Sequence, residues 1–176
     1  MNIYITGGSG FIGHQLTNKL KSYGISVTNI PRTQLQDLNS FRFKNNSCLV
    51  HLAAHVHNIS VKDTAEDDRL HFSVNRDLTH SLAKKFFTEV PHGKLIFSST
   101  VHTHGISTKG VFTTEDKPIP ESTYGQSKLE AEQLLKSSNN YTVETIAYDS
   151  GFNSVSAFYT AFKNINNVTP AVFKKM

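Results

Sequence analysis

The stretch Asn2-Ile-Tyr-Ile-Thr-Gly-Gly-Ser-Gly-Phe-Ile-Gly-His14 decides the fold of this chain. Its first five residues include β-branched and aromatic side chains, which predict a short buried strand. The glycines that follow this strand include Gly7, Gly10 and Gly13, which are spaced three residues apart. A helical pattern then begins at Gln15, and one helix face is expected to carry Phe11, Ile12, Leu16 and Leu20. The predicted order is therefore strand, glycine turn, helix.

Each of the three glycines has a separate physical role in such a turn. Gly7 lets the chain turn sharply off the strand, Gly10 leaves room for a pyrophosphate beside the backbone, and Gly13 lets the helix lie close to the strand. The free N–H groups and the positive dipole end of the helix would then face a phosphate. An ordinary glycine-rich turn is the alternative, but this sequence context favours a dinucleotide site.

Composition limits the class of protein. The 176 residues suit one domain, or one incomplete domain with a small appendage, and 38% apolar residues are enough for a core. No apolar run is long enough to span a bilayer, and the start has no features of a signal peptide, so a cytoplasmic protein without membrane contact is expected. Cys48 is the only cysteine, which excludes an internal disulfide.

The second predicted strand bears on coenzyme choice. Ile25 to Ile30 reads as a strand that ends at Pro31. An acidic residue at this position favours NAD, whereas an arginine accommodates the 2′-phosphate of NADP. Arg32 therefore favours NADP over NAD, although a surface arginine beside a turn is the alternative. Residues 33–46 are too few for a further strand and its crossover helix, so this edge of the sheet is expected to be abbreviated.

A continuous apolar strand is predicted from Ser47, and it leads into small residues that let a cofactor approach the backbone. We predict cofactor contacts at Leu52, Ala53 and Ala54. Histidines crowd this region and suggest a metal site: His51, His55 and His57. Alternate strand residues face opposite ways, and no cysteine or carboxylate lies at ligand spacing, so no metal is expected.

A long amphipathic helix is predicted after an acidic start at residues 64–68, and Pro91-His-Gly93 ends it. Its apolar residues are Leu70, Phe72, Val74, Leu78, Leu82, Phe86 and Phe87. The next strand, Lys94 to Thr100, ends in hydroxyl residues, at the edge where open α/β sheets place their ligands. A long loop, from Val101 to Thr123, follows.

Tyr124 and Lys128 are four residues apart, so they share a face of the helical segment that begins there. A lysine cation beside a phenol favours the phenolate, which can give and take a proton at neutral pH. Thr100, at the end of the neighbouring strand, can hydrogen-bond the substrate oxygen that exchanges this proton with Tyr124. A surface Tyr–Lys pair is the alternative for this spacing alone, but the glycine turn and the Ser-Ser-Thr strand end favour a catalytic set for hydride transfer.

These motifs resemble the extended short-chain dehydrogenase/reductase family of NAD(P)-dependent sugar-nucleotide epimerases, dehydratases and reductases, over about residues 1–136. The segments that carry the resemblance are Thr6–Gly13, His51–Ala54, Val74-Asn75, Phe97–Thr100 and Tyr124–Lys128. Residues 53–57 and 113–118 resemble bacterial 4-epimerases and 4-reductases acting on UDP-linked sugars.

The resemblance implies an incomplete Rossmann-type, doubly wound parallel sheet and a UDP-sugar substrate. It implies that Thr100, Tyr124 and Lys128 are catalytic. The implied cofactor contacts are Gly7, Gly10, Phe11, Ile12, Gly13, Arg32, Leu52, Ala53, Ala54 and Lys128, the last on the nicotinamide ribose. The family continues for well over a hundred residues beyond the Tyr–Lys helix, which makes turnover by this chain alone doubtful.

The last residues, 137–176, predict a helical appendage instead. Ala147 and Gly151 mark a helix crossing and a turn, and Val155, Phe158 and Phe162 share one face of the next helix. Thr169-Pro170 reads as the start of a last helix. A strand from Tyr141 to Tyr148 is the competing interpretation of the residues before this turn.

This segment resembles the second helix-turn-helix of AraC-family transcription regulators, over about residues 129–176. The resemblance implies DNA contacts at Asn153, Ser156, Thr160 and Lys163. From Leu129 onward four lysines balance four acidic residues, so the segment lacks the basic surface of a typical DNA-binding unit. A DNA-binding regulator is thus the alternative to the enzyme, and a nonfunctional splice of two genes is a third hypothesis.

Overall fold

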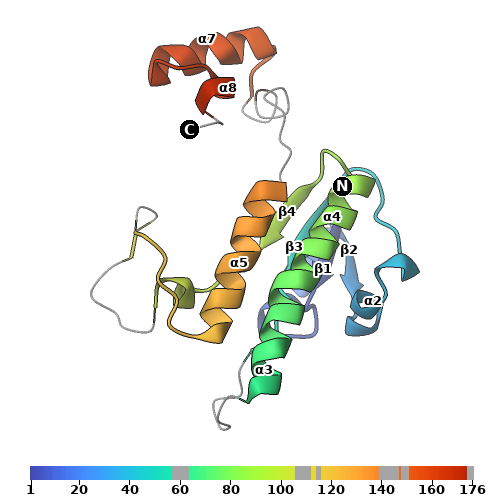
Figure 1. Ribbon diagram of the computed structural model, residues 1–176. Coiled ribbons are helices and arrows are strands. Elements are labelled where there is room, and N and C mark those ends of the chain that lie inside the picture. Colours follow the sequence, from blue (N-terminus) through green and yellow to red (C-terminus); the bar gives the residue numbers. More distant parts are fainter. Residues whose placement is uncertain (57–63, 106–111, 114–115, 139–146, 148–150, 174–176) are drawn as a thin grey trace. The chain divides into compact units, whose positions relative to one another are not determined.

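A computed structural model describes residues 1–56, 64–105, 112–113, 116–138, 147 and 151–173 of the chain. The chain divides into two compact units, Met1–Ser138 and Asn139–Met176 (Figure 1). Among the described residues, no helix is at once long enough and apolar enough to cross a membrane.

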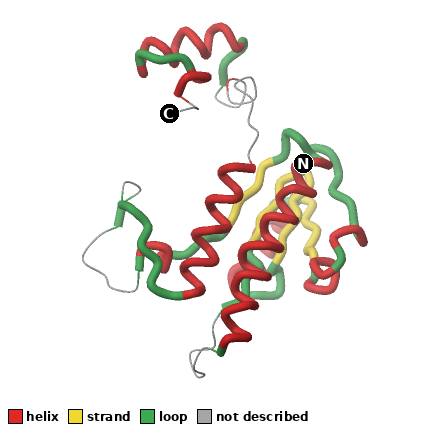
Figure 2. Tube along the Cα trace, in the orientation of Figure 1, coloured by secondary structure: helices red, strands yellow, loops and turns green. Residues whose placement is uncertain are grey.

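The first unit is built on a four-stranded parallel sheet with the order β2-β1-β3-β4. Its strands are β1 (Asn2–Thr6), β2 (Ser26–Ile30), β3 (Ser47–His51) and β4 (Lys94–Phe97), drawn in yellow in Figure 2. Within the described part of the chain, β2 pairs only with β1, and α2 (Arg32–Gln36) and the 3₁₀ turn η1 (Leu38–Ser40) follow it. The predicted Rossmann-type parallel sheet is confirmed, and its edge after Arg32 is short.

Helices cover both faces of the sheet, because side chains alternate between the faces along each strand. Helix α1 (Phe11–Ser22) packs on the face formed by Ile3, Ile5, Cys48 and Val50. The opposite face lies under a long helix made of α3 (Ala65–Leu70), the π-helical η2 (His71–Leu78) and α4 (Thr79–Glu89). Helix α5 (Thr123–Ser138) runs beside α4 (Figure 1).

The long helix begins as predicted but buries a different face in its first half. Thr64 caps it, accepting a hydrogen bond from the Asp67 amide while the Asp67 side chain accepts from Thr64 N–H. Leu82 and Phe86 enter the core as the apolar pattern predicted. The expectation that the apolar residues before Leu78 form the buried face is wrong. The residues that this half of the helix buries are polar: His71, Asn75 and Thr79.

The predicted apolar face of α1 is also partly wrong. Leu16 and Leu20 pack on the core, but Phe11 and Ile12 are 86% and 62% exposed. Both lie in the first turn of α1, where Gly13 rather than an apolar side chain makes the close contact with the end of β1.

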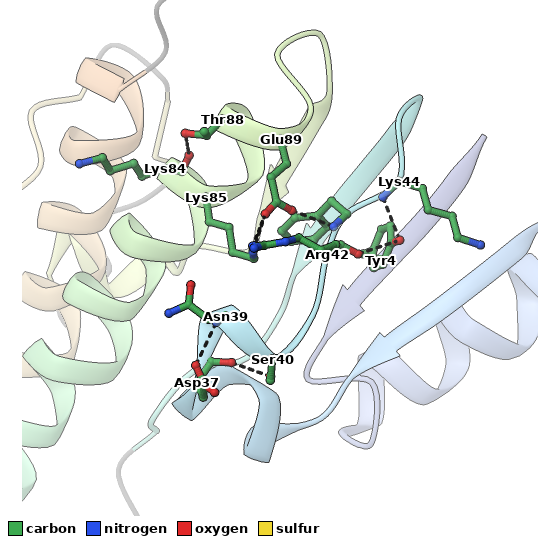
Figure 3. A network of polar contacts seen from close by, with 11 residues as sticks. Tyr4, Asp37, Asn39, Ser40, Arg42, Lys44, Lys84, Lys85, Thr88 and Glu89 are labelled. Atoms are coloured by element: carbon green, nitrogen blue, oxygen red, sulfur yellow. Dashed lines mark hydrogen bonds and ion pairs between the residues drawn. The ribbon is translucent and has the colours of Figure 1, made fainter.

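The short connection after β2 is anchored by polar contacts and aromatic rings (Figure 3). The Glu89 carboxylate accepts hydrogen bonds from Arg42 Nη1 (2.9 Å), the Phe43 amide (2.9 Å) and Lys85 Nζ (2.6 Å). The Phe43 ring makes edge contacts with the rings of Tyr4 and Phe86, with centroids 4.9 Å apart in each pair. These contacts close the space beside β1 without a full crossover helix.

The second unit contains α7 (Val155–Asn166) and α8 (Pro170–Phe173). Gly151 adopts a left-handed conformation with φ +83°, and the amide that follows it donates to the Ala147 carbonyl at 3.1 Å. Ser154 caps α7, and an aromatic series joins the two helices: Phe152, Phe158, Phe162 and Phe173. The predicted glycine turn and two following helices are present, whereas the choice of helix or strand for residues 141–146 and 148 lies outside the described residues.

Replacing Glu89 with glutamine should destabilise the first unit by about 1–2 kcal/mol at pH 7. Burial alone would raise the Glu89 pKa, but the bonds from Lys85, Phe43 and Arg42 hold it below the usual 4.5. This stabilisation is therefore present above pH 4.5 and is lost as the pH falls through the lower folded-state pKa. Urea denaturation at pH 7 and at acid pH measures it, with the exposed Glu66→Gln as control. Equal losses at both pH values would contradict the assignment.

Candidate functional site

Close backbone contacts shape the glycine turn between β1 and α1. A Cβ on Gly13 would lie 2.2 Å from the Gly7 carbonyl oxygen, so only glycine fits there. Gly7 has φ +71°, and a Cβ on it would lie 2.8 Å from the Ala53 amide nitrogen. Gly10 is less constrained, since its φ is −74° and the nearest atom would be 3.3 Å away.

Gly8 is a further constrained position of the turn, and the sequence motif does not single it out. A Cβ on Gly8 would lie 2.5 Å from Asn29 Oδ1, and the same oxygen accepts a hydrogen bond from Thr17 at 3.1 Å. Asn29 on β2 and Thr17 on α1 therefore hold one side of the turn. The other side faces residues 52–54.

A row of side chains crosses the carboxyl ends of the strands beneath the long helix. Thr6 on β1 is in register with His51 on β3, and His51 is in register with Phe97 on β4. Thr6 Oγ1 lies 2.6 Å from His51 Nδ1 and accepts a hydrogen bond from the Ala53 amide at 3.1 Å. His51 Nε2 lies 2.8 Å from Thr79 Oγ1. The row thus joins β1, the loop after β3 and the long helix.

Lys128 reaches this row from α5. Its side chain is buried, with 2% exposed, and its Nζ lies 3.9 Å from the centroid of the Phe97 ring. The other contact of Phe97 is His51, whose ring stacks on it at 5.8 Å. Burial lowers the Lys128 pKa to about 8, with Glu132 opposing the shift. Burial and then the Lys128 charge lower the His51 pKa to about 3, so His51 is neutral at physiological pH.

Asn75 joins the loop after β3 to the helix that carries Tyr124. Its side chain accepts from the His55 amide at 2.7 Å and donates to the His55 carbonyl at 2.9 Å. It also donates to Ser127 Oγ at 3.2 Å, and Ser127 donates to the Tyr124 carbonyl at 2.8 Å. We predicted no role for Asn75 or Ser127. The available signal was the four-residue spacing of Asn75 from Thr79.

Tyr124 lies at the start of α5, between two histidine rings. The centroid of its ring is 5.7 Å from that of His71 and 5.9 Å from that of His102. A Cβ on Gly125 would lie 2.4 Å from the His102 carbonyl oxygen, so this glycine lets α5 approach the 3₁₀ turn η3 (Val101–His104). Thr100 caps η3 by accepting a hydrogen bond from the His102 amide at 3.3 Å. Thr100 and Tyr124 therefore both flank His102.

Acidic residues of α5 tie it to neighbouring elements. Ser99, at the end of β4, donates a hydrogen bond to Glu132, which lies one helical turn after Lys128. Glu130 accepts from Arg76 Nη1 of η2 at 2.9 Å. Our sequence reasoning missed both carboxylates, although their spacing along the helix was visible.

The remaining predicted residues have diverse environments. Arg32 is exposed at the start of α2, directly beyond β2, and Leu52 packs on the core beneath α1. Ala53 and Ala54 are half-buried beside the glycine turn. No group of three His, Cys, Asp or Glu side chains that could hold a metal ion occurs among the described residues, from which His57 is omitted. In the second unit, the proposed DNA contacts are all exposed: Asn153, Ser156, Thr160 and Lys163.

A glycine turn after the first parallel strand, together with a Tyr–Lys helix beside a hydroxyl-rich strand end, is the arrangement of extended short-chain dehydrogenases and reductases. Residues 1–148 match the family profile of the RmlD substrate binding domain, and the chain belongs to this family. Residues 128–176 match a helix-turn-helix domain profile. Both likenesses inferred from the sequence are thereby confirmed.

Relatives in this class are sugar-nucleotide enzymes. The chain is 32% identical over 155 residues to a UDP-glucose 4-epimerase of Vibrio cholerae, covering 76% of this chain and 46% of that protein. A dTDP-4-dehydrorhamnose reductase from Clostridium acetobutylicum has the same fold, with TM-score 0.65, 24% identity and coverage of 79% of this chain and 50% of that one. A UDP-glucuronic acid 4-epimerase from Bacillus cereus, solved with NAD, gives TM-score 0.59 and 24% identity, covering 80% and 52%. The chain spans about half the length of the curated relatives it matches.

Alanine at Gly13 and at Gly10 should have different effects on stability. Gly13→Ala forces a side chain into the Gly7 carbonyl and should lower the free energy of unfolding by about 3 kcal/mol or more. Gly10→Ala has an ordinary backbone conformation and should cost less than about 1 kcal/mol. Thermal melts of both variants measure the difference, and similar midpoints would contradict the packing of the turn.

Proposed function

We propose that residues 1–136 form an NAD(P)-binding domain that acts by hydride transfer on a UDP-linked sugar, as an epimerase, dehydratase or reductase. The observation that carries the proposal is that the row Thr6, His51 and Phe97 connects the glycine turn to Lys128, on the helix α5 that also carries Tyr124. The similarity to the UDP-glucose 4-epimerase of Vibrio cholerae supports the substrate class.

The glycine turn and residues 52–54 would hold the dinucleotide. Gly7, Gly10 and Gly13 leave backbone space for a pyrophosphate at the start of α1, where free N–H groups attract anions. Exposed Phe11 and Ile12 stand in the first turn beside this space and would cover the ligand. Ala53 and Ala54 would border it from the other side, with Leu52 supporting them from the core.

The coenzyme is NADP or NAD. A solved relative holds NAD, whereas Arg32 favours NADP because a guanidinium at the end of the second strand suits a 2′-phosphate. Lys128 would bind the nicotinamide ribose from α5. A bound nicotinamide supplies the group that takes and returns a hydride.

The chain's own groups would handle the proton. Tyr124 Oη would take the proton from the sugar hydroxyl during oxidation and return it to the carbonyl oxygen during reduction. Thr100 Oγ1 would hydrogen-bond the same sugar oxygen and fix its position. The buried Lys128 ammonium would stabilise negative charge at the phenol oxygen, and Glu132 would favour its charged form.

Coenzyme binding tests the proposal directly. NADPH or NADH should raise the melting midpoint of the chain, because a ligand that binds only the native state stabilises it. Gly10→Ala should abolish this rise while it keeps the midpoint of the free protein, since the added methyl group occupies the pyrophosphate space. No saturable rise with either coenzyme would refute the proposal.

A second candidate function belongs to residues 137–176, which would form a DNA-binding helix-turn-helix segment. The specific observation is the exposed row Asn153, Ser156, Thr160 and Lys163, on a unit whose sequence matches a helix-turn-helix profile. Phe158 faces inward, so this row is free to enter a major groove.

A gel-shift series at several salt concentrations tests DNA binding. Lys163→Ala should reduce the slope of log affinity against log salt by about 1, because one phosphate contact is lost. Lys19→Ala, at an exposed position of α1 in the first unit, is the matched control and should leave the slope unchanged. Binding without sequence preference that vanishes at physiological salt would argue against a regulator.

A further inference from the structure

His51 and Thr79 form a buried polar contact that the chemistry proposed above does not use. His51 is 1% exposed and Thr79 is equally buried, yet both ring nitrogens of His51 have threonine hydroxyl partners. A buried polar pair is costly unless every donor and acceptor is satisfied. The neutral ring has one proton for its two nitrogens, so one nitrogen donates to a threonine hydroxyl and the other accepts from one.

We assign the following direction to each hydrogen bond; the reverse arrangement, in which Thr79 donates to Nε2 and Nδ1–H donates to Thr6, is the alternative that the NMR test below decides. The Thr6 hydroxyl oxygen accepts from the Ala53 amide, so its single proton is free to go to His51 Nδ1. His51 is neutral because burial and the Lys128 charge disfavour its cation, which leaves its one proton on Nε2. That proton is donated to Thr79 Oγ1. The chain of bonds runs Ala53 N–H, Thr6 hydroxyl, His51 ring, Thr79 hydroxyl.

This series of hydrogen bonds connects two backbone loops, the glycine turn and residues 52–54, which together would form the dinucleotide cradle. Gly7 follows Thr6 directly, and its Cα approaches Ala53 so closely that a Cβ would lie 2.8 Å from the Ala53 amide nitrogen. The Leu52 amide also donates to the Thr6 carbonyl at 3.3 Å. The Thr6 hydroxyl thus sets the spacing between the glycine turn and residues 52–54. His51 and Thr79 in turn hold that hydroxyl.

We propose that His51 and Thr79 are positioning residues that fix the spacing of the two loops and thereby preorganise the dinucleotide cradle. The identity of the ligand rests on the proposed function. The fixed position of the Ala53 amide does not depend on a ligand. Without the Thr79 hydroxyl, the buried Nε2–H of His51 loses its partner. The His51 ring is then free to rotate, and the hydrogen bond from the Ala53 amide to the Thr6 hydroxyl weakens.

The test uses the full 176-residue chain and three variants. Thr79→Val removes the hydroxyl at nearly constant shape, and Thr79→Ser keeps it. Thr88→Val is the matched control, because Thr88 is exposed on the same helix and donates only to the Lys84 carbonyl of its own helix, at 2.7 Å. Amide hydrogen exchange at Ala53 and dissociation constants for NADPH and NADH are measured for each variant.

Thr79→Val should speed Ala53 exchange about tenfold and weaken coenzyme binding by about the same factor, whereas Thr79→Ser and Thr88→Val stay near the original chain. Unchanged Ala53 exchange in Thr79→Val overturns the positioning role, even where coenzyme still binds. A chain that binds neither coenzyme overturns the proposed function, and Ala53 exchange then still decides the positioning role.

Nitrogen NMR of the His51 ring in the unsubstituted protein is a second test, and it does not depend on whether a variant folds. The ring should stay neutral throughout pH 5–8, because burial and the Lys128 charge lower its pKa to about 3, and in the assigned arrangement its proton lies on Nε2. The charged groups that bear on it are Lys128, on α5, and through Lys128 its helix neighbour Glu132. A proton on Nδ1, or protonation of both nitrogens within this range, contradicts the proposed chain of hydrogen bonds.

Discussion

The contact between Gly13 and the Gly7 carbonyl is the constraint on which the first unit depends. It brings the start of α1 against the end of β1, at a distance that no side chain permits. The N–H groups of the first helical turn are thereby placed at the carboxyl edge of the sheet. Gly125 provides a second contact of the same kind, between α5 and the His102 carbonyl. Two close backbone approaches thus fix the positions of α1 and α5 at this edge of the sheet.

Polar residues replace the apolar core where these elements converge. Thr6 and His51 occupy the last paired position of β1 and β3, and the long helix directs Thr79 to His51 and Asn75 to the backbone of His55. The π-helical geometry of this segment is common at functional sites, and its buried residues, His71 and Asn75, are polar, whereas those of α4 beyond Thr79 are apolar. At this end of the layer the side chains of Thr6, His51 and Thr79 are joined by hydrogen bonds, and Asn75 is hydrogen-bonded to His55 and Ser127.

Local sequence patterns predicted the parts of the fold that depend on neighbouring residues. The strand–glycine–helix order, the Tyr124–Lys128 spacing and the Gly151 turn are all short-range signals. The polar helix face was missed because Asn75 is buried by partners distant in the sequence, His55 and Ser127. The burial expected for Phe11 is wrong for a related reason, since hydrophobicity does not reveal that the first turn of α1 packs through Gly13. The roles of Thr100, Tyr124 and Lys128 are still predictions.

Strand β4 is an edge strand of the sheet among the described residues. Within the described residues it pairs only with β3, so one row of its backbone groups lacks a strand partner, and Ile96 is 56% exposed. Such a border can recruit other chains into intermolecular β-structure. The strand has only four residues and begins with an exposed lysine, Lys94, whose charge repels an identical copy approaching the same border. The short length of β4 and the charge of Lys94 therefore both disfavour aggregation through this edge of the described sheet.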